Sequence, residues 1–178
     1  MSWTAPKTDW ATAYLVTAAD MNLYLRDNLA CVGDHMGFST WAPALSITSG
    51  STAPGLGDAA VQDGSWLRAG TTVSGLVHGS CLIRFSSNSA AGTGIYTITL
   101  PLNASSSDTA RQNVVGFGAI YDASGADTHH VVCVQHSSAV FKMKYATTGS
   151  AETWVRGNAP HAWSSDDRIS LHHCYEVR

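Results

Sequence analysis

Histidine is the residue type in this chain with the most scope for chemistry. Eight are present, and four of them form the adjacent pairs His129–His130 and His172–His173. A neutral imidazole binds zinc, and a ring with an ordinary pKa gains its proton just below neutral pH. Both pairs fall in stretches that alternate like β-strands, where neighbouring side chains point to opposite faces. Neither pair can therefore hold one metal ion by itself.

A zinc site would need histidine or cysteine ligands from two strands or from two subunits. His130 and His172 are the best-placed candidates, and in a trimer one such histidine would become three around the symmetry axis. His173 is a weaker candidate because its strand face carries apolar residues typical of a core. The simpler interpretation is that these are surface or interface histidines with local hydrogen bonds, so we expect no metal and no cofactor.

The four cysteines, Cys31, Cys81, Cys133 and Cys174, are spread almost evenly and form no C-x-x-C pair. This spacing is not that of a zinc ribbon, and the chain opens without the basic and apolar segments of a secretion signal. A disulfide framework usually accompanies secretion, whereas a free cysteine commonly packs as a small apolar residue. We therefore expect four reduced core cysteines in a protein made in the cytoplasm.

Recognisable catalytic motifs are absent from the sequence. It contains no G-x-S-x-G motif, and the many serines make any Ser-His-Asp choice arbitrary. Asp166 and Asp167 are the most plausible carboxylate pair for sugar cleavage, but they stand in a polar turn, where aspartates usually face solvent. Gly92-Thr93-Gly94 precedes a predicted strand instead of the helix that follows a phosphate-binding loop. We expect a protein that is not an enzyme, with glycan hydrolysis as a distant alternative.

Three of the six tryptophans, Trp66, Trp154 and Trp163, stand at strand edges or turns. A ring in such a place would stack on a sugar or contact a partner protein. Packing and subunit contact are the more common roles of aromatic side chains. These three residues are our candidates for contact with a glycan or a partner.

The elements that would position these residues are mainly β-strands. Of the 178 residues, 13% are charged and 44% hydrophobic, a composition too apolar for disorder and too poor in charge for a helical bundle. From Trp41 onward, alternating or apolar runs recur between turns rich in Gly, Ser, Asn and Asp. The predicted strands are Thr72–His78, Ser80–Phe85, Ile95–Leu100, Val114–Tyr121, His129–Gln135, Val140–Tyr145 and Arg168–Val177. Such short, closely spaced strands predict an antiparallel β-sandwich or jelly-roll-like domain over residues 34–178.

The last predicted strand shows its two faces most clearly. Ile169, Leu171, His173, Tyr175 and Val177 share one face, and Ser170, His172, Cys174, Glu176 and Arg178 share the other. The first set is mainly apolar, so we expect it to face the core.

An extended arm and one short α-helix precede this domain. Residues 1–16 have no steady period and carry Trp3, Pro6, Trp10 and Tyr14, which we expect to anchor the chain in a partner. Thr17 and Asp20 are spaced like a capping box, and Gly33 suits the end of a helix over residues 17–33. Within it, Met21, Leu25, Leu29 and Val32 form one narrow apolar stripe. So short a helix needs a packing partner, and we expect the stripe to meet its copies in a homotrimer.

The charge and hydropathy patterns exclude several classes of partner. Ten basic and thirteen acidic residues give a net charge of −3, which provides no basic surface for nucleic acid or anionic membranes. No apolar run approaches the roughly 18 residues of a membrane span. We therefore expect neither nucleic-acid binding nor a membrane span.

Two stretches of the sequence are similar to a known family. The first is Thr8-Asp9-Trp10 followed by Leu15-Val16-Thr17-Ala18-Ala19-Asp20-Met21-Asn22 and Leu25-Arg26-Asp27-Asn28-Leu29. It resembles the opening of small virion proteins of phages that infect actinobacteria, which are usually described as minor tail or capsid decoration proteins. The second, Gly50-Ser51-Thr52-Ala53-Pro54-Gly55-Leu56-Gly57 with Gly94-Ile95-Tyr96-Thr97-Ile98-Thr99-Leu100-Pro101, is similar to the β domain that follows that opening. Asp58-Ala59 departs from the Asn-Gly-like turn expected there, and the histidine pairs also look peculiar to this chain.

The resemblance implies a virion component, often trimeric, and carries no catalytic residue over to this chain. With the arm, the helix and the β domain, it indicates a non-enzymatic structural protein located in the virion, in contact with capsid or tail proteins. The alternative from a different class is a receptor-binding module that recognises a glycan on the host surface.

Overall fold

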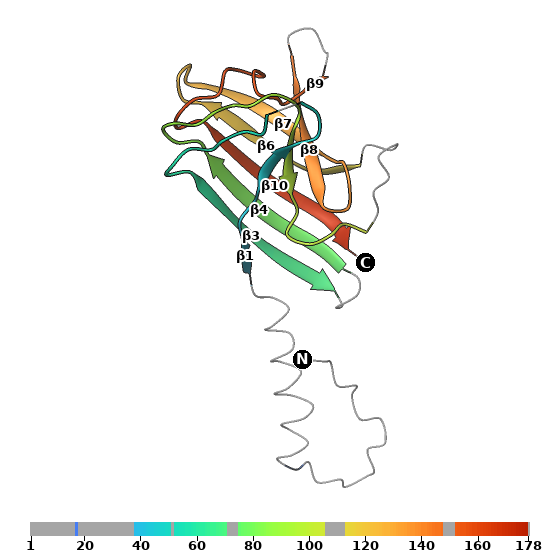
Figure 1. Ribbon diagram of the computed structural model, residues 1–178. Coiled ribbons are helices and arrows are strands. Elements are labelled where there is room, and N and C mark those ends of the chain that lie inside the picture. The colour runs from blue at the N-terminus through green and yellow to red at the C-terminus, as the bar shows by residue number, and fades with distance from the viewer. Residues whose placement is uncertain are drawn as a thin grey trace. The chain divides into compact units, whose positions relative to one another are not determined.

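The computed structural model of the chain describes residue 17 and residues 38–50, 52–70, 75–105, 113–147 and 152–177 (Figure 1). The chain divides into two compact units, Met1–Phe38 and Ser39–Arg178, and the second contains every described strand. The predicted arm and, apart from Thr17, the predicted helix lie outside the described residues, as do Trp3, Pro6, Trp10, Tyr14, Met21, Leu25, Leu29 and Val32. In the described part of the chain, no helix is long and apolar enough to cross a membrane.

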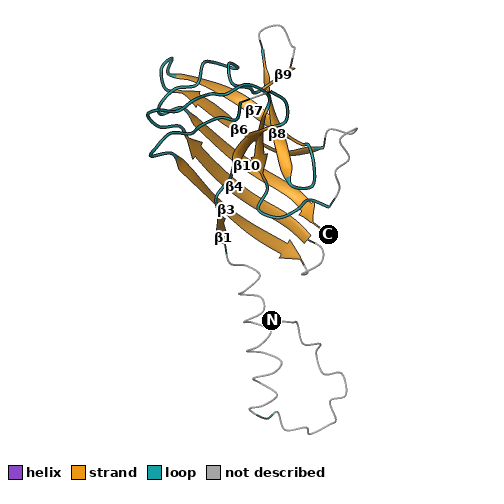
Figure 2. Ribbon diagram, in the orientation of Figure 1, coloured by secondary structure: helices purple, strands orange, loops and turns teal. Residues whose placement is uncertain are grey.

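Ten antiparallel strands make up the Ser39–Arg178 unit. They are β1 (Ser39–Trp41), β2 (Leu45–Ile47), β3 (Val61–Gly70), β4 (Gly75–Arg84), β5 (Tyr96–Thr99), β6 (Val114–Asp122), β7 (Asp127–Gln135), β8 (Val140–Ala146), β9 (Glu152–Trp154) and β10 (Arg168–Val177). Their order across the sheet is β1-β3-β4-β10-β6-β7-β8-β5-β2, and β9 pairs with β8 off this path. The sheet curls into a half-barrel (Figure 2).

Strand β10 lies at the centre of the sheet. It pairs with β4 along all ten of its residues and with β6 from Arg168 to His173. Its side chains alternate strictly between exposed and buried, which confirms the two predicted faces. The inner face joins a core whose largest fully buried apolar side chains are Tyr96, Phe85, Phe141, Ile83, Ile98, Ile120, Met143, Ile169 and Leu171. Each such side chain contributes roughly 1.5–3 kcal/mol to folding.

The prediction of a mainly β, antiparallel fold is confirmed, and five predicted strands correspond to β5, β6, β7, β8 and β10. The strands form one continuous curled sheet instead of two separate sheets. Because twisted sheets of many strands curl, the concave face encloses a core that a second sheet would otherwise cover. The strands β1, β2, β3 and β9 have no predicted counterpart. Three of them have only three residues, and β3 contains Asp63-Gly64, a dipeptide typical of turns.

Gly79 accounts for a further difference from the predicted strands. The sequence predicts a break between Thr72–His78 and Ser80–Phe85, whereas β4 continues through Gly79 to Arg84. A Cβ atom on Gly79 would overlap His173 Nε2 and lie 2.8 Å from the Ser65 carbonyl oxygen. The glycine therefore allows the ring of His173 to lie directly against the backbone of β4.

The substitution Gly79→Ala is expected to lower the free energy of unfolding by about 1–3 kcal/mol, because the added methyl group overpacks the contact with His173 and with β3. Gly55→Ala is the matched control, since a Cβ atom there has no neighbour closer than 3.8 Å. Urea denaturation of the full chain measures both variants. Equal stability of the two would contradict the packing of His173 on Gly79.

Candidate functional site

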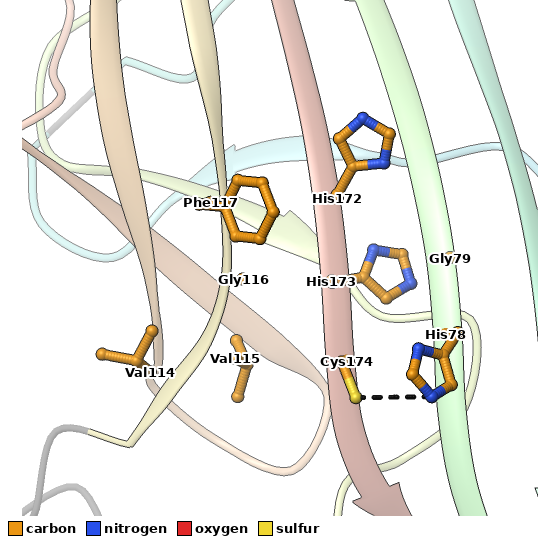
Figure 3. Close-up of a pocket in the computed structure, with 9 residues that line it drawn as sticks. All are labelled: His78, Gly79, Val114, Val115, Gly116, Phe117, His172, His173 and Cys174. Atoms are coloured by element: carbon orange, nitrogen blue, oxygen red, sulfur yellow. Dashed lines mark hydrogen bonds between the residues drawn. The ribbon is translucent and has the colours of Figure 1, made fainter.

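A groove on the outer face of the sheet gathers aromatic, histidine and cysteine side chains (Figure 3). We call it the outer-face groove. It has a volume of about 460 Å³ and lies over β4, β10 and β6. Its lining residues are His78, Gly79, Val114, Val115, Gly116, Phe117, His172, His173 and Cys174.

The groove forms where β6 separates from β10. Pairing between these two strands ends at Gly116 and His173, while β10 continues against β4 as far as Val177. A register shift between Val114 and Gly116 marks a bulge at the same place, and a bulge bends the strand that carries it. The hollow therefore lies where β6 no longer pairs with β10.

Apolar side chains remain exposed along this groove. Phe117 and Val114 keep 67% and 65% of their surface accessible. The ring of Phe117 lies beside that of His172, with 6.0 Å between ring centroids. Val132 of β7 pairs directly with Phe117 and is also exposed on the outer face. An apolar strip thus crosses the middle of a sheet face that is otherwise open to solvent.

Cys174 and His78 lie opposite each other on β10 and β4 at one side of the groove. The Cys174 sulfur is 3.7 Å from His78 Nε2, and both side chains are exposed. The prediction of a buried cysteine is therefore wrong for Cys174, because it falls on the outer face of its strand. It is confirmed for Cys81 and Cys133, which are free and buried. Burial raises the pKa of the Cys81 thiol to about 12 and also raises that of Cys133.

A second hollow of about 360 Å³ continues the outer face from β10 and β4 toward β3 and β1. Its polar lining residues are Thr40, Asp63, Ser65, Ser80, Ser170 and His172. The hydroxyl groups of Ser65 and Ser80 lie 3.3 Å apart and share a hydrogen bond. His172 belongs to both hollows, so the outer face changes across this residue from apolar to rich in hydroxyl groups.

The two histidine pairs are divided between the faces of the sheet, as predicted. His130 and His172 are exposed on the outer face, on strands that are separated by β6. His129 is half-buried, and its ring stacks on that of His161 at 5.7 Å between centroids. The structure does not bring His130 and His172 together within one chain.

His173 occupies the core, where it is only 3% exposed. Its ring contacts the rings of Trp41, Phe141 and Tyr175, and neither ring nitrogen has a hydrogen-bond partner among the described residues. Desolvation by burial, together with smaller effects of nearby His172 and His78, lowers the pKa of His173 to about 4. The ring is therefore neutral at physiological pH and packs as an aromatic residue.

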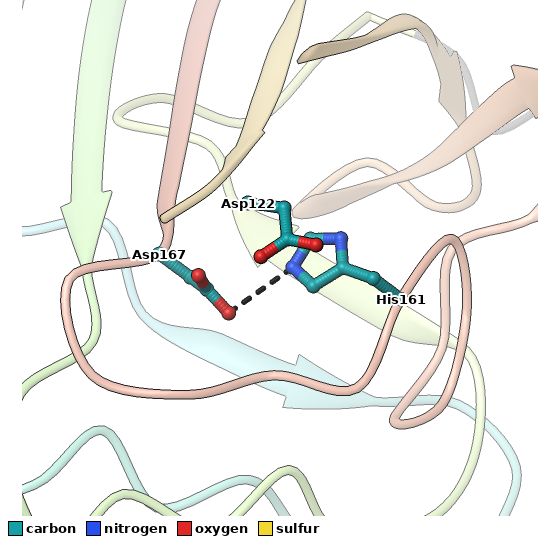
Figure 4. A group of neighbouring side chains, drawn as sticks. All are labelled: Asp122, His161 and Asp167. Atoms are coloured by element: carbon teal, nitrogen blue, oxygen red, sulfur yellow. Dashed lines mark hydrogen bonds and ion pairs between the residues drawn. The ribbon is translucent and has the colours of Figure 1, made fainter. Parts of the chain in front are cut away.

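A second cluster joins Asp122, His161 and Asp167 at the end of the sheet where the last strand begins (Figure 4). His161 Nε2 lies 3.1 Å from Asp167 Oδ2. Asp167 is fully buried and also accepts hydrogen bonds from the backbone N–H groups of Ala123 and Ser164, at 2.8 and 2.6 Å. Asp122 accepts from the Ser124 hydroxyl and from the backbone of Ser124 and Gly125, which lowers its pKa.

The ligand atoms of this cluster lie within 4.8 Å of one another, as metal ligands could. The histidine argues against that role. Its Nδ1 atom is buried and has no hydrogen-bond partner among the described residues, whereas a metal-bound imidazole normally donates its other N–H group. With its proton on Nε2, His161 donates a hydrogen bond to the Asp167 carboxylate, and its buried Nδ1 atom carries no hydrogen that would need an acceptor. The cluster thus ties the loop before β10 to the β6–β7 turn.

The sequence does not reveal this role of Asp167. The prediction of a solvated turn fits Asp166, which is exposed and has a φ of 70°, but not the buried residue beside it. His161 and Ala123 reach Asp167 only through the tertiary fold. One feature of the sequence could have indicated this role: Asp167 stands directly before a strongly alternating strand, and an aspartate in such a place often accepts backbone hydrogen bonds.

The three tryptophans singled out from the sequence lie in different surroundings. Trp66 is half-buried and packs against the core. Trp163 is 8% exposed, stacks on Phe85 with 4.8 Å between centroids and donates a hydrogen bond to the Arg156 carbonyl. Trp154 is half-buried on β9, with Lys144 Nζ 4.7 Å from its ring centroid. Trp66 and Trp163 therefore serve the core, and of the three only Trp154 stays a candidate for contact with a ligand.

Comparison with known proteins gives no relative: no family model, curated protein or solved structure matches the chain. The resemblance to actinobacteriophage virion proteins therefore stays a prediction.

Removing the buried carboxylate in Asp167→Ala is expected to lower the free energy of unfolding by about 3–5 kcal/mol, because His161 and two backbone N–H groups lose their shared acceptor. Asp166→Asn is the control, since it changes the exposed neighbour and asparagine tolerates the same backbone conformation. That variant should stay within about 0.5 kcal/mol of the wild type. Denaturant titration measures both, and a small effect of Asp167→Ala would contradict the structural role of the cluster.

The fold is also expected to lose stability in acid through His173. Between its ordinary pKa of 6.5 and its folded pKa of about 4, the unfolded chain binds a proton that the folded chain excludes. The contribution is therefore complete above pH 6.5 and falls by roughly 3 kcal/mol as the pH approaches 4. Between pH 7 and pH 4.5, the unfolding free energy of the wild type should fall relative to that of His173→Leu by about 2–3 kcal/mol. Parallel curves would show that His173 does not titrate in this way.

Proposed function

We propose that the chain is a non-enzymatic structural protein of a phage virion, a homotrimeric component of the capsid or tail surface. The resemblance of its N-terminal and β segments to small actinobacteriophage virion proteins supports this role. In this proposal the arm over residues 1–16 and the helix over residues 17–33 anchor the protein to the particle. The half-barrel serves as a jelly-roll-like head displayed outward.

The observation that carries the proposal is the exposure of apolar side chains on the outer face of the sheet. Phe117 and Val114 stay mostly exposed, and Leu76 and Val132 on the same face are 41% and 39% exposed. Large apolar patches on soluble proteins commonly mark surfaces that another protein covers. Apolar contacts with few charges are typical of interfaces between copies of one chain. We therefore assign this face to a neighbouring copy in the trimer.

Recognition of an anionic host glycan is the second proposal, and Trp154 supports it. Lys142 Nζ lies 5.5 Å from the centroid of its ring, and Lys144 Nζ lies 4.7 Å from it while also forming an ion pair with Glu152. Cationic groups beside an aromatic ring suit a negatively charged saccharide. Binding of the purified protein to an array of host cell-wall glycans, lost in Trp154→Ala, would favour this role over a purely structural one.

The full chain is expected to sediment as a trimer at micromolar concentration. Phe117→Ser should weaken association roughly tenfold or more, because it removes an apolar side chain from the contact. Phe38→Ser is the matched control, since Phe38 is 74% exposed outside the groove. A monomeric wild type, or equal effects of the two variants, would contradict the assigned interface.

The virion role itself is tested on purified particles. The wild-type protein should be located on the capsid or tail by averaged particle images, and a chain that lacks residues 1–16 should be absent from them. Far-UV circular dichroism of the truncated chain shows whether the β unit remains folded. Wild-type occupancy of the particle by the truncated chain would place the anchor elsewhere.

A further inference from the structure

We propose that Cys174, His78 and His172 form a binding site for a thiophilic divalent cation of the zinc class, on the outer face of the sheet. All three residues come from one chain and line the outer-face groove. The inference therefore depends neither on a trimer nor on a virion role.

The separation of the first two ligand atoms is close to that in a tetrahedral zinc site. Bond lengths of about 2.3 Å to sulfur and 2.0–2.1 Å to nitrogen, at a tetrahedral angle, place the two ligand atoms about 3.5–3.6 Å apart. The observed separation of Cys174 Sγ from His78 Nε2 is 3.7 Å. The thiol and the imidazole are thus already neighbours in the metal-free protein, and a turn of the exposed His78 ring would aim its Nε2 lone pair at the metal instead of at the sulfur.

His172 supplies the third ligand because of the two-residue period of β10. It precedes Cys174 by two residues, so both side chains project from the same face, about 6.6 Å apart along the strand. His78 lies directly across from Cys174 on β4. Figure 3 shows the ring of His172 on the same side of β10 but turned away from the sulfur. The ring is exposed, so rotation about its side-chain bonds can bring it to the metal.

The chemistry of these ligands selects the metal class. One thiolate and two neutral imidazoles favour zinc and related soft cations over magnesium or calcium, which prefer oxygen ligands. On binding, the Cys174 thiol proton leaves to solvent and the sulfur lone pair forms the metal bond. Cys81 and Cys133 cannot take this role, because both are buried in the core. Glu176 shares the outer face of β10 but is not among the residues that line the groove.

Three protein ligands leave one tetrahedral position open for a further ligand. A bound metal would connect β10 to β4 within the groove. Water would fill the open position wherever this face is not covered. In an assembly, a donor side chain from the covering surface would replace the water.

Cobalt(II) binding to the untagged full chain tests the site, because cobalt replaces zinc and reports its ligands by absorption. After dialysis against a chelator, one equivalent of cobalt should produce a thiolate-to-metal charge-transfer band and the intense visible bands of a tetrahedral site. Zinc should then displace the cobalt. Elemental analysis should find one zinc per chain after the excess is removed.

Variants assign the ligands. Cys174→Ser should abolish the charge-transfer band, while His78→Ala and His172→Ala should each weaken cobalt affinity about 100-fold or more. His130→Ala is the matched control, since it removes an exposed histidine from the same face outside the groove. Cys31→Ser should keep the band, which excludes the cysteine outside the described residues. Absence of the band, its survival in Cys174→Ser, or equal affinities of the His172→Ala and His130→Ala variants would overturn the proposal.

Discussion

The pairing of β10 with neighbours on both of its edges is the constraint on which the rest of the β unit depends. Ten registered pairs with β4 and six with β6 fix the strand in the middle of the sheet. Because its side chains alternate, a shift of the register by one residue would exchange the two faces. Ile169, Leu171 and His173 would then leave the core, and His172 and Cys174 would enter it. The same register thus sets the core and the composition of the outer face.

The outer face owes its chemistry to places where this regular pairing ends. Strand β6 separates from β10 at a bulge beyond Gly116; Val114 is exposed at this gap, and Phe117 is exposed beside His172. On the other edge, β4 keeps its pairing and places His78 opposite Cys174. An apolar strip and the neighbouring side chains of Cys174 and His78 therefore occur in one groove. The proposed subunit contact and the proposed metal site use different residues of this one groove.

The sequence predicts those features that depend on one strand alone. The alternation of β10 correctly places His173 inside and His172 outside. The alternation of β7 likewise places His129 on the inner face and His130 on the outer face. Features that arise from distant parts of the chain are missed. Gly79 resembles a turn residue because nothing local shows that the ring of His173 covers it, and Asp167 resembles a solvated turn residue because its partners lie far along the chain or in a loop. The general tendency of cysteine to be buried gives the wrong prediction for Cys174, whereas the alternation of its own strand places it on the exposed face.

A disulfide trap measures the central register most directly. Residues directly opposite each other on antiparallel strands have Cα atoms about 4.5–5.5 Å apart, within the range of a disulfide, while diagonal neighbours are about 7–8 Å apart. In a Cys31→Ser background under mild oxidation, His78→Cys is expected to form a disulfide with Cys174 in nearly all molecules, as peptide mapping would show. Leu76→Cys and Ser80→Cys, on the same face of β4, should retain free thiols. Cross-linking of Cys174 to either of those positions in preference to position 78 would contradict the register, and with it the arrangement of the groove.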